Sequence, residues 1–404
     1  MPIFGDLARM FQNQGPVNWE IARQIGVYMA TEGKPESNVD PILRISYEEL
    51  GRIADMHIAT RTGLSTLVDG REVTVRPAGR GTWASGTLDA YRSLFEHLAA
   101  SLGRAGMAAP PPTELAEMGD EAEGPFSPEF LGNMLQVITP TILGMQLGLM
   151  VGHLARRSLG EYDLPIPRPA LGSANAELLV VADNVEAFAK DWSLPPEDVR
   201  LWVALDSITH HAVLQLPHVR DRMHHLLSSY AGGFAPDPDA LAGRLEGLDP
   251  TDASALEQAF GDPEALIGDM QTEEQRRLQP QLEALTVAIE GFVDYTLDEI
   301  GGGLIGSYGS LTEALRRRRV QANAGDRFVE RLFGLELSQK QYDRGERFVR
   351  GIAERAGTEG LARLWSDERH LPTPAEVDAP GLWWERVNLP DPRDPDDQPD
   401  EAGG

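Results

Sequence analysis

Apolar residues recur at three- and four-residue spacing along most of the chain, which is the pattern of amphipathic helices. The segments with this spacing lie in both halves of the sequence: 19–31, 47–58, 88–102, 198–215, 279–300, 327–332, 340–355 and 360–365. Strand-like segments are confined to 73–75 and 177–181, and the second is the better candidate. The pattern therefore predicts a mainly α fold with a small β element.

One stretch, 130–152, contains no charged residue and is long enough to cross a bilayer. Several polar residues and Pro140 interrupt it, however. Gly144, Gly148 and Gly152 recur every four residues and form one stripe on a helix. Such a stripe allows a second backbone to approach closely. We therefore expect a buried core helix here and no membrane partner.

Two segments have the composition of a linker and a disordered tail. Residues 108–127 combine three consecutive prolines with five acidic residues, and residues 391–404 contain six acidic residues and one arginine. We therefore expect an N-terminal helical region over 1–107, an acidic Pro-rich linker over 108–127, a site-bearing domain over 128–389, and a disordered acidic tail over 390–404.

The charge balance limits the partners that the protein can bind. Lys and Arg number 36 against 63 Asp and Glu, so the formal net charge is −27. This argues against a nucleic-acid or anionic-membrane partner. The one basic run, Arg316–Arg319, is expected to be a solvated helix end. The N-terminus lacks a basic start followed by an apolar run, so the expected location is cytoplasmic.

The absence of cysteine limits the chemistry in the same way. Disulfides, thiolate metal ligands and thiol nucleophiles are all excluded. Any transition metal must therefore be held by histidines and carboxylates.

Residues 201–213 have the frame of a zinc-peptidase helix, H-E-x-x-H. In that motif two histidines one turn apart ligate one Zn²⁺, and the glutamate beside the first acts as general base. Here Asp206 stands at the first histidine position, Ser207 at the glutamate position and His210 at the second histidine. A serine hydroxyl is not basic near neutral pH, and losing a positioned base removes about 10²–10⁴-fold in rate.

A third ligand has to come from a distant segment, and Glu290 with Asp294 is the strongest candidate. The two are one helical turn apart, so Glu290 would bind the metal while Asp294 would hold a ligand histidine from behind. Asp206, His210 and Glu290 form an acceptable ligand set for zinc or manganese. Zinc is therefore the candidate cofactor, and a metal-free site remains the alternative.

Five of the nine histidines lie between positions 210 and 225. A second metal site built from His218, His224 or His225 is a weaker alternative. Pro217 separates these three from His210, and the adjacent pair points to different faces of a helix.

Several ordered blocks make the chain resemble the zincin-like metalloproteases of actinobacteria and related bacteria, a family also labelled deazaflavin-coenzyme-biosynthesis-associated. The resemblance covers residues 1–387. The matching blocks are 15–19, 144–146, 151–155, 160–167, 200–205, 210–213, 217–220 and 290–291. It implies a mostly helical zincin-like fold with a zinc hydrolase site. Carried over by position, the metal ligands fall at Asp206, His210 and Glu290, and the base at Ser207.

Two of those four positions differ from the family pattern. The first hypothesis is therefore a catalytically impaired zincin-like protein that acts by binding a peptide or protein, with strand 177–181 as the candidate edge for the ligand. The alternative is an active metal-dependent hydrolase with a remodelled Asp–His–Glu site, in which His211 or Asp294 serves as base. A third hypothesis is a helical scaffold with a vestigial site. The sequence does not indicate the oligomeric state.

Overall fold

The computed structural model describes residues 15–67, 70–107, 128–168, 177–235, 271–320 and 324–390. The predicted linker over 108–127 and the tail from 391 onward lie outside these residues. The described part is mostly helical and contains one two-stranded sheet, which confirms the predicted fold class. No described helix is both long and apolar enough to cross a membrane.

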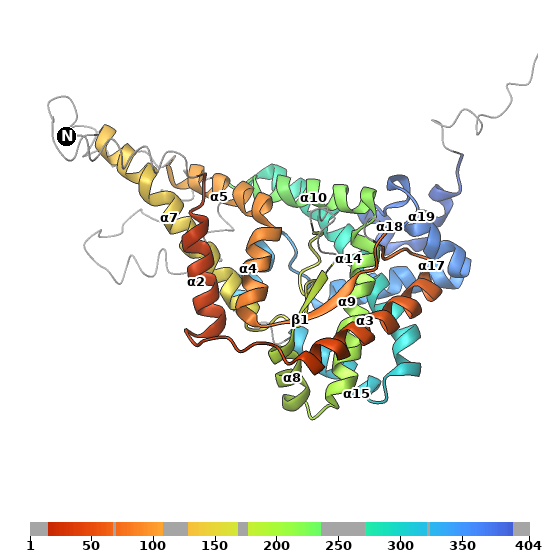
Figure 1. Ribbon diagram of the computed structural model, residues 1–404. Coiled ribbons are helices and arrows are strands. Elements are labelled where there is room, and N and C mark those ends of the chain that lie inside the picture. The colour runs from red at the N-terminus through yellow and green to blue at the C-terminus, as the bar shows by residue number, and fades with distance from the viewer. Residues whose placement is uncertain are drawn as a thin grey trace, which may run out of the picture.

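The helices alternate with short connections along the described chain. They are α2 (Trp19–Thr31), α3 (Pro41–Thr62), α4 (Arg80–Ala90), α5 (Arg92–Met107), α7 (Pro128–Ala155), α8 (Ala182–Asp191), α9 (Pro196–Leu214), α10 (Pro217–Ala231), α14 (Glu273–Leu304), α15 (Tyr308–Val320), α16 (Ala324–Leu332), α17 (Gln339–Leu364), α18 (Pro374–Asp378) and α19 (Pro380–Val387), with a 3₁₀ turn at Glu368–His370. Helices α2 and α7 lie at one end of the molecule and α17 to α19 at the other, with β1 and α9 between them (Figure 1).

The structure differs from the sequence prediction at one helix boundary and agrees with it at another. The segment predicted as one helix over 88–102 belongs to two, because Tyr91 between α4 and α5 has φ −103° and ψ 20°. The two helical segments predicted over 340–355 and 360–365 are confirmed, because α17 consists of two helices that meet at a kink at Gly357. The φ of Gly357 is 58°, a left-handed value that favours glycine.

The glycine stripe of α7 packs against α2, which runs beside it (Figure 1). A Cβ placed on Gly144 would lie 2.4 Å from the carbonyl oxygen of Asn18, and one on Gly148 would lie 2.6 Å from that of Ala22. Gly152 meets α2 equally closely. Only hydrogen fits at these positions, which confirms that the stripe meets a second backbone. Ile142, Met145 and Leu149 of the same helix are exposed, so the expectation of a helix buried in the core holds for one face only.

The small sheet joins the two halves of the described chain. Strand β1 (Thr74–Ala78) pairs in parallel with β2 (Glu177–Val181), with Thr74 opposite Glu177 and Ala78 opposite Val181. One hydrophobic core cluster includes residues from both halves. The predicted division into a region over 1–107 and a domain over 128–389 stays a prediction. The sheet and the core both contain residues from each of these two parts.

Helix α14 is held in position by a close crossing with α17. A Cβ on Gly291 would lie 2.3 Å from the carbonyl carbon of Gly345, so the two backbones touch. A capping box, in which the side chains of Thr272 and Gln275 bond each other's backbone, fixes the start of α14. Because Glu290 directly precedes Gly291, this crossing determines where the Glu290 carboxylate lies.

Candidate functional site

His210 lies between two carboxylates that come from different helices. Helix α9 places Asp206 and His210 on one face, and α14 brings Glu290 against them. The Nε2 atom of His210 is 3.3 Å from Oε1 of Glu290. Its Nδ1 atom is 3.0 Å from the carbonyl oxygen of Asp206 and 3.5 Å from Oδ1 of the same residue. Asp206 and Glu290 therefore face opposite nitrogens of one imidazole ring.

This arrangement favours the protonated form of His210. Both ring nitrogens face oxygen acceptors, and only the imidazolium carries a donor on each nitrogen. The His210 ring is 3% exposed, and burial alone would lower its pKa. The carboxylates of Asp206 and Glu290 outweigh burial and raise the pKa of His210 well above its ordinary value.

The predicted zinc ligands do not fit a three-ligand zinc site in this arrangement. Zinc needs a neutral imidazole with a free lone pair directed at the ion. The Glu290 carboxylate lies near Nε2 of His210, whereas the Asp206 carboxylate lies near Nδ1. The two carboxylates therefore do not face one common point where an ion could lie. Within the described residues, no group of three His, Asp or Glu side chains is placed to hold a metal, and this includes the alternative set of histidines.

Ser207, at the position of the family's general base, is buried against Gly160. It is fully buried, and its Oγ makes no hydrogen bond with any described residue. A Cβ on Gly160 would lie 2.9 Å from this Oγ, so Gly160 closes the space in front of it. The hydroxyl is therefore directed at a neighbouring loop.

We expect Ser207→Glu to lower the free energy of unfolding by about 3 kcal/mol or more, because it buries a carboxylate with no counter-charge. Urea unfolding at pH 7 measures this loss. The control, Ser207→Ala, removes a hydroxyl without a partner and is expected to leave stability unchanged or slightly higher. A Ser207→Glu protein as stable as the parent would show that position 207 has open space.

Asp294 and His211, the two predicted supporting residues, contact other partners. Both oxygens of Asp294 accept hydrogen bonds from Arg319, each at 2.9 Å, and the Arg319 guanidinium lies 4.3 Å from the centre of the Tyr342 ring. His211 is fully buried, and its Nδ1 is 3.1 Å from the Tyr162 hydroxyl. Burial and the nearby Arg168 lower the pKa of His211 to about 3, so this ring is neutral.

The basic run Arg316–Arg319 has two different halves. Arg316 and Arg317 are mostly exposed and pair with Glu313, as expected of a solvated helix end. Arg318 instead donates to Asp163 at 2.6 Å, and Arg319 holds Asp294. The expectation of a solvated end is therefore wrong for the last two arginines, because carboxylates on distant segments face them.

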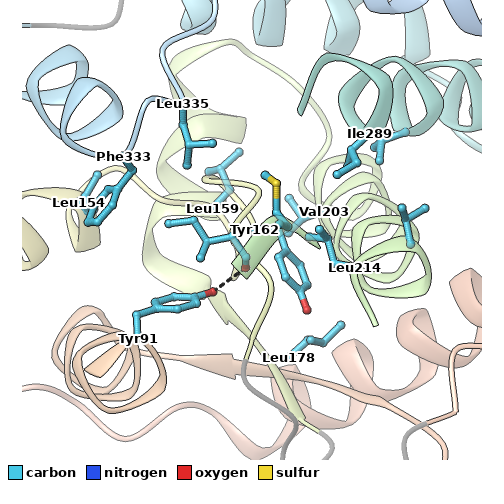
Figure 2. Close-up of a cluster of buried hydrophobic side chains, with 14 of the residues drawn as sticks. Tyr91, Leu154, Leu159, Tyr162, Leu178, Val203, Leu214, Ile289, Phe333 and Leu335 are labelled. Carbon is cyan, nitrogen blue, oxygen red and sulfur yellow. Dashed lines mark hydrogen bonds between the residues drawn. The ribbon is translucent and has the colours of Figure 1, made fainter. Parts of the chain in front are cut away.

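Residues 159–168 contribute contacts that sequence reasoning did not assign. The ring of Tyr162 stacks on His210 with 5.8 Å between centroids and 18° between planes. Figure 2 shows Tyr162 among core side chains that include Leu178 and Leu214. Glu161 and Arg168 form a buried ion pair, with 3.3 Å between Nε and Oε1. The signal in the sequence was a glutamate and an arginine flanking a Pro-rich block that contains Asp163 among mainly apolar residues.

Glu330 on α16 is a further titratable group whose pKa is influenced by Glu290. Burial raises the pKa of Glu330 to about 7; the Glu336 and Glu290 carboxylates add to the rise, while Arg157 opposes it. Its folded pKa therefore lies above the unfolded value, so the folded protein holds a proton that the unfolded chain releases.

The contribution of Glu330 to stability should therefore fall as pH rises from about 4.5 to 7. Glu330→Gln removes this fall and should be more stable than the parent by about 1–3 kcal/mol at pH 8, with little difference at pH 4.5. Urea unfolding at both pH values tests this, with the exposed Glu313→Gln as control. Parallel pH profiles for Glu330→Gln and the parent would contradict the expected titration.

Known families and structures define the class of the protein. The family described as zincin-like metallopeptidase matches residues 17–384, so the chain belongs to this family. A similar solved structure is that of a proposed hydrolase with a novel fold from Chloroflexus aurantiacus. The TM-score is 0.60 at 24% identity, over 92% of this chain and 98% of the other, which shows a shared fold. No curated protein matches the chain.

Proposed function

We propose that this zincin-like protein has lost zinc-dependent peptidase chemistry and acts by binding a peptide or protein. The observation that carries the proposal is the placement of Asp206 and Glu290 on opposite nitrogens of His210. With Asp206 at Nδ1 and Glu290 at Nε2, the two carboxylates do not converge on one ion, and the imidazolium that they favour offers no lone pair to a metal. The imidazolium then bridges α9 and α14 where family members would hold an ion.

None of the three residues predicted as a general base is suited to that role in hydrolysis. Ser207 faces Gly160, His211 is a weak base because burial lowers its pKa to about 3, and Asp294 is bonded by Arg319. A base must be within hydrogen-bond reach of the proton that it removes. These three contacts support a role in binding over a role in catalysis.

The fold and the charge support a peptide ligand of a particular kind. Strand β2 precedes the motif helix α9 in the chain, as the edge strand does in zincins that hold extended peptides. The formal net charge of −27 favours basic over acidic ligands. We therefore expect an extended peptide with basic side chains.

Fluorescence anisotropy with pools of labelled basic and acidic peptides tests this function. We expect the basic pool to bind in a salt-dependent way, and mass spectrometry to show no cleavage when zinc is added. Glu290→Gln serves as the matched variant, because it should leave the absence of cleavage unchanged. Zinc-dependent cleavage that disappears in Glu290→Gln would overturn the proposal, and so would the failure of both pools to bind.

A further inference from the structure

The edge of β2 that faces away from β1 is already occupied by the chain itself. Alternate N–H groups of a strand point to opposite edges, so Leu179 and Val181 share one edge. The Val181 N–H donates to the carbonyl oxygen of Leu159 at 2.9 Å, and the Leu179 N–H donates to Oε2 of Glu161 at 3.1 Å. Arg168 donates to the carbonyl of Glu177 on the same strand at 2.8 Å.

The same segment also contacts the helix that carries the motif. Gly160 lies against Ser207 of α9, and a Cβ on Gly160 would also lie 4.0 Å from the carbonyl oxygen of Leu179. Two residues later, the ring of Tyr162 stacks on His210 and is 2% exposed. The segment therefore fills the space between β2 and α9, where an extended ligand on the β2 edge would have to lie.

Specific hydrogen bonds hold the segment in this position. Oδ1 of Asp163 accepts from the N–H groups of Leu159 and Gly160 at 2.9 and 3.2 Å, and its Oδ2 accepts from Arg318 at 2.6 Å. The Trp83 indole donates to the Gly160 carbonyl at 3.1 Å. The turn is thus anchored from α4 and α15 as well as from β2.

One small cavity lies against the segment. It is lined by residues of α4, α5, α7 and the segment, including Trp83, Thr87, Tyr91, Glu161 and Ile166. The Oγ1 of Thr87 and the Oγ of Ser207 are buried and make no hydrogen bond with any described residue. Neither hydroxyl loses a hydrogen bond when the segment moves, whereas Leu159, Tyr162 and Ile166 have to leave the core.

We propose that residues 159–168 act as an intramolecular ligand of β2 and keep its peptide edge closed until the segment is displaced. The ligand that replaces it is an extended peptide, because the segment supplies a main-chain carbonyl and a carboxylate oxygen to the strand. This inference rests on the proposed binding function, since it describes how the same edge is controlled.

A disulfide between positions 160 and 207 tests whether the segment moves. The chain has no cysteine, so Gly160→Cys with Ser207→Cys creates a single pair. The 2.9 Å between a Cβ at 160 and the γ atom at 207 is close to the roughly 3 Å that a disulfide requires between Cβ and the far sulfur. Oxidation locks the segment onto α9, and reduction releases it.

Amide hydrogen exchange of Leu179 and Val181 gives a measurement that needs no ligand. We expect exchange of these two amides to slow about tenfold or more on oxidation, while Leu178 and Val180, which face β1, change little. Asp163→Asn, which weakens the anchor to Arg318, should speed exchange of the same two amides without any cysteine. Exchange that is equal in the oxidised and reduced forms and unaffected by Asp163→Asn overturns the inference.

Peptide binding by the oxidised and reduced forms separates the two proposals. Binding that is lost about tenfold or more on oxidation and restored by reduction supports both, with Ser207→Cys alone as the redox control. Exchange that responds to the lock while neither form binds the basic peptide pool supports the closing segment and contradicts the binding function. Binding that is unaffected by the lock places the ligand elsewhere and overturns the inference.

Discussion

Replacing Glu161 by alanine is expected to lower the free energy of unfolding by about 3–5 kcal/mol. Glu161 and Arg168 have side chains that are 1% and 9% exposed, and they pair with each other across 3.3 Å. Without the carboxylate, the Arg168 charge stays buried with no counter-charge, and the Leu179 N–H loses its acceptor. Urea unfolding at pH 7 measures the loss.

Two controls separate the lost pair from a general effect of substitution. Glu161→Leu combined with Arg168→Met removes both charges and should recover much of the stability, since well-packed apolar residues often replace a buried pair without loss. Asp89→Ala breaks an ion pair with Arg23 whose side chains are about half exposed, and should cost less than about 1 kcal/mol. A Glu161→Ala loss as small as that of Asp89→Ala would contradict the account of this segment.

Gly148→Ala is expected to destabilise the protein by about 2–3 kcal/mol, although alanine favours helix over glycine. The added Cβ would lie 2.6 Å from the carbonyl oxygen of Ala22 and 3.0 Å from the Gly26 nitrogen, so α2 and α7 must separate. Thermal and urea unfolding measure the change.

The matched control makes the same substitution at Gly302, which lies in α14 with nothing within 4 Å of an added Cβ. Gly302→Ala should raise stability by up to about 1 kcal/mol, because it restricts the unfolded chain and has the better helix propensity. Opposite signs for the two variants are the expected result. Equal effects would show that the α2–α7 contact is looser than the glycine stripe requires.

The helices and their closest contact could be predicted because they depend on local patterns. Helical spacing of apolar residues identified most of the described helices, and the stripe of Gly144, Gly148 and Gly152 identified the face of α7 that meets another backbone. The sequence also predicted that the segments bearing His210 and Glu290 meet, and the structure places the two side chains 3.3 Å apart.

The details of the site depend on contacts that spacing does not encode. Helical spacing puts Asp206 on the same face as His210, but the orientation of the ring decides which nitrogen each carboxylate meets. Asp294 is held by Arg319, which is 25 residues away in the sequence. Arg319 belongs to a run of arginines, and such a run is typical of a solvated helix end, so the sequence did not predict this contact. The link between Tyr162 and His210 likewise requires the path of the chain in three dimensions.

Elemental analysis of the native protein, purified without chelator, tests the replacement of the metal site most directly. The expected zinc content is below about 0.1 ion per chain and is the same in His210→Gln and Glu290→Gln, because neither residue holds an ion in the parent. About one zinc per chain, lost in both variants, would contradict the assignment of His210 as an imidazolium between two carboxylates.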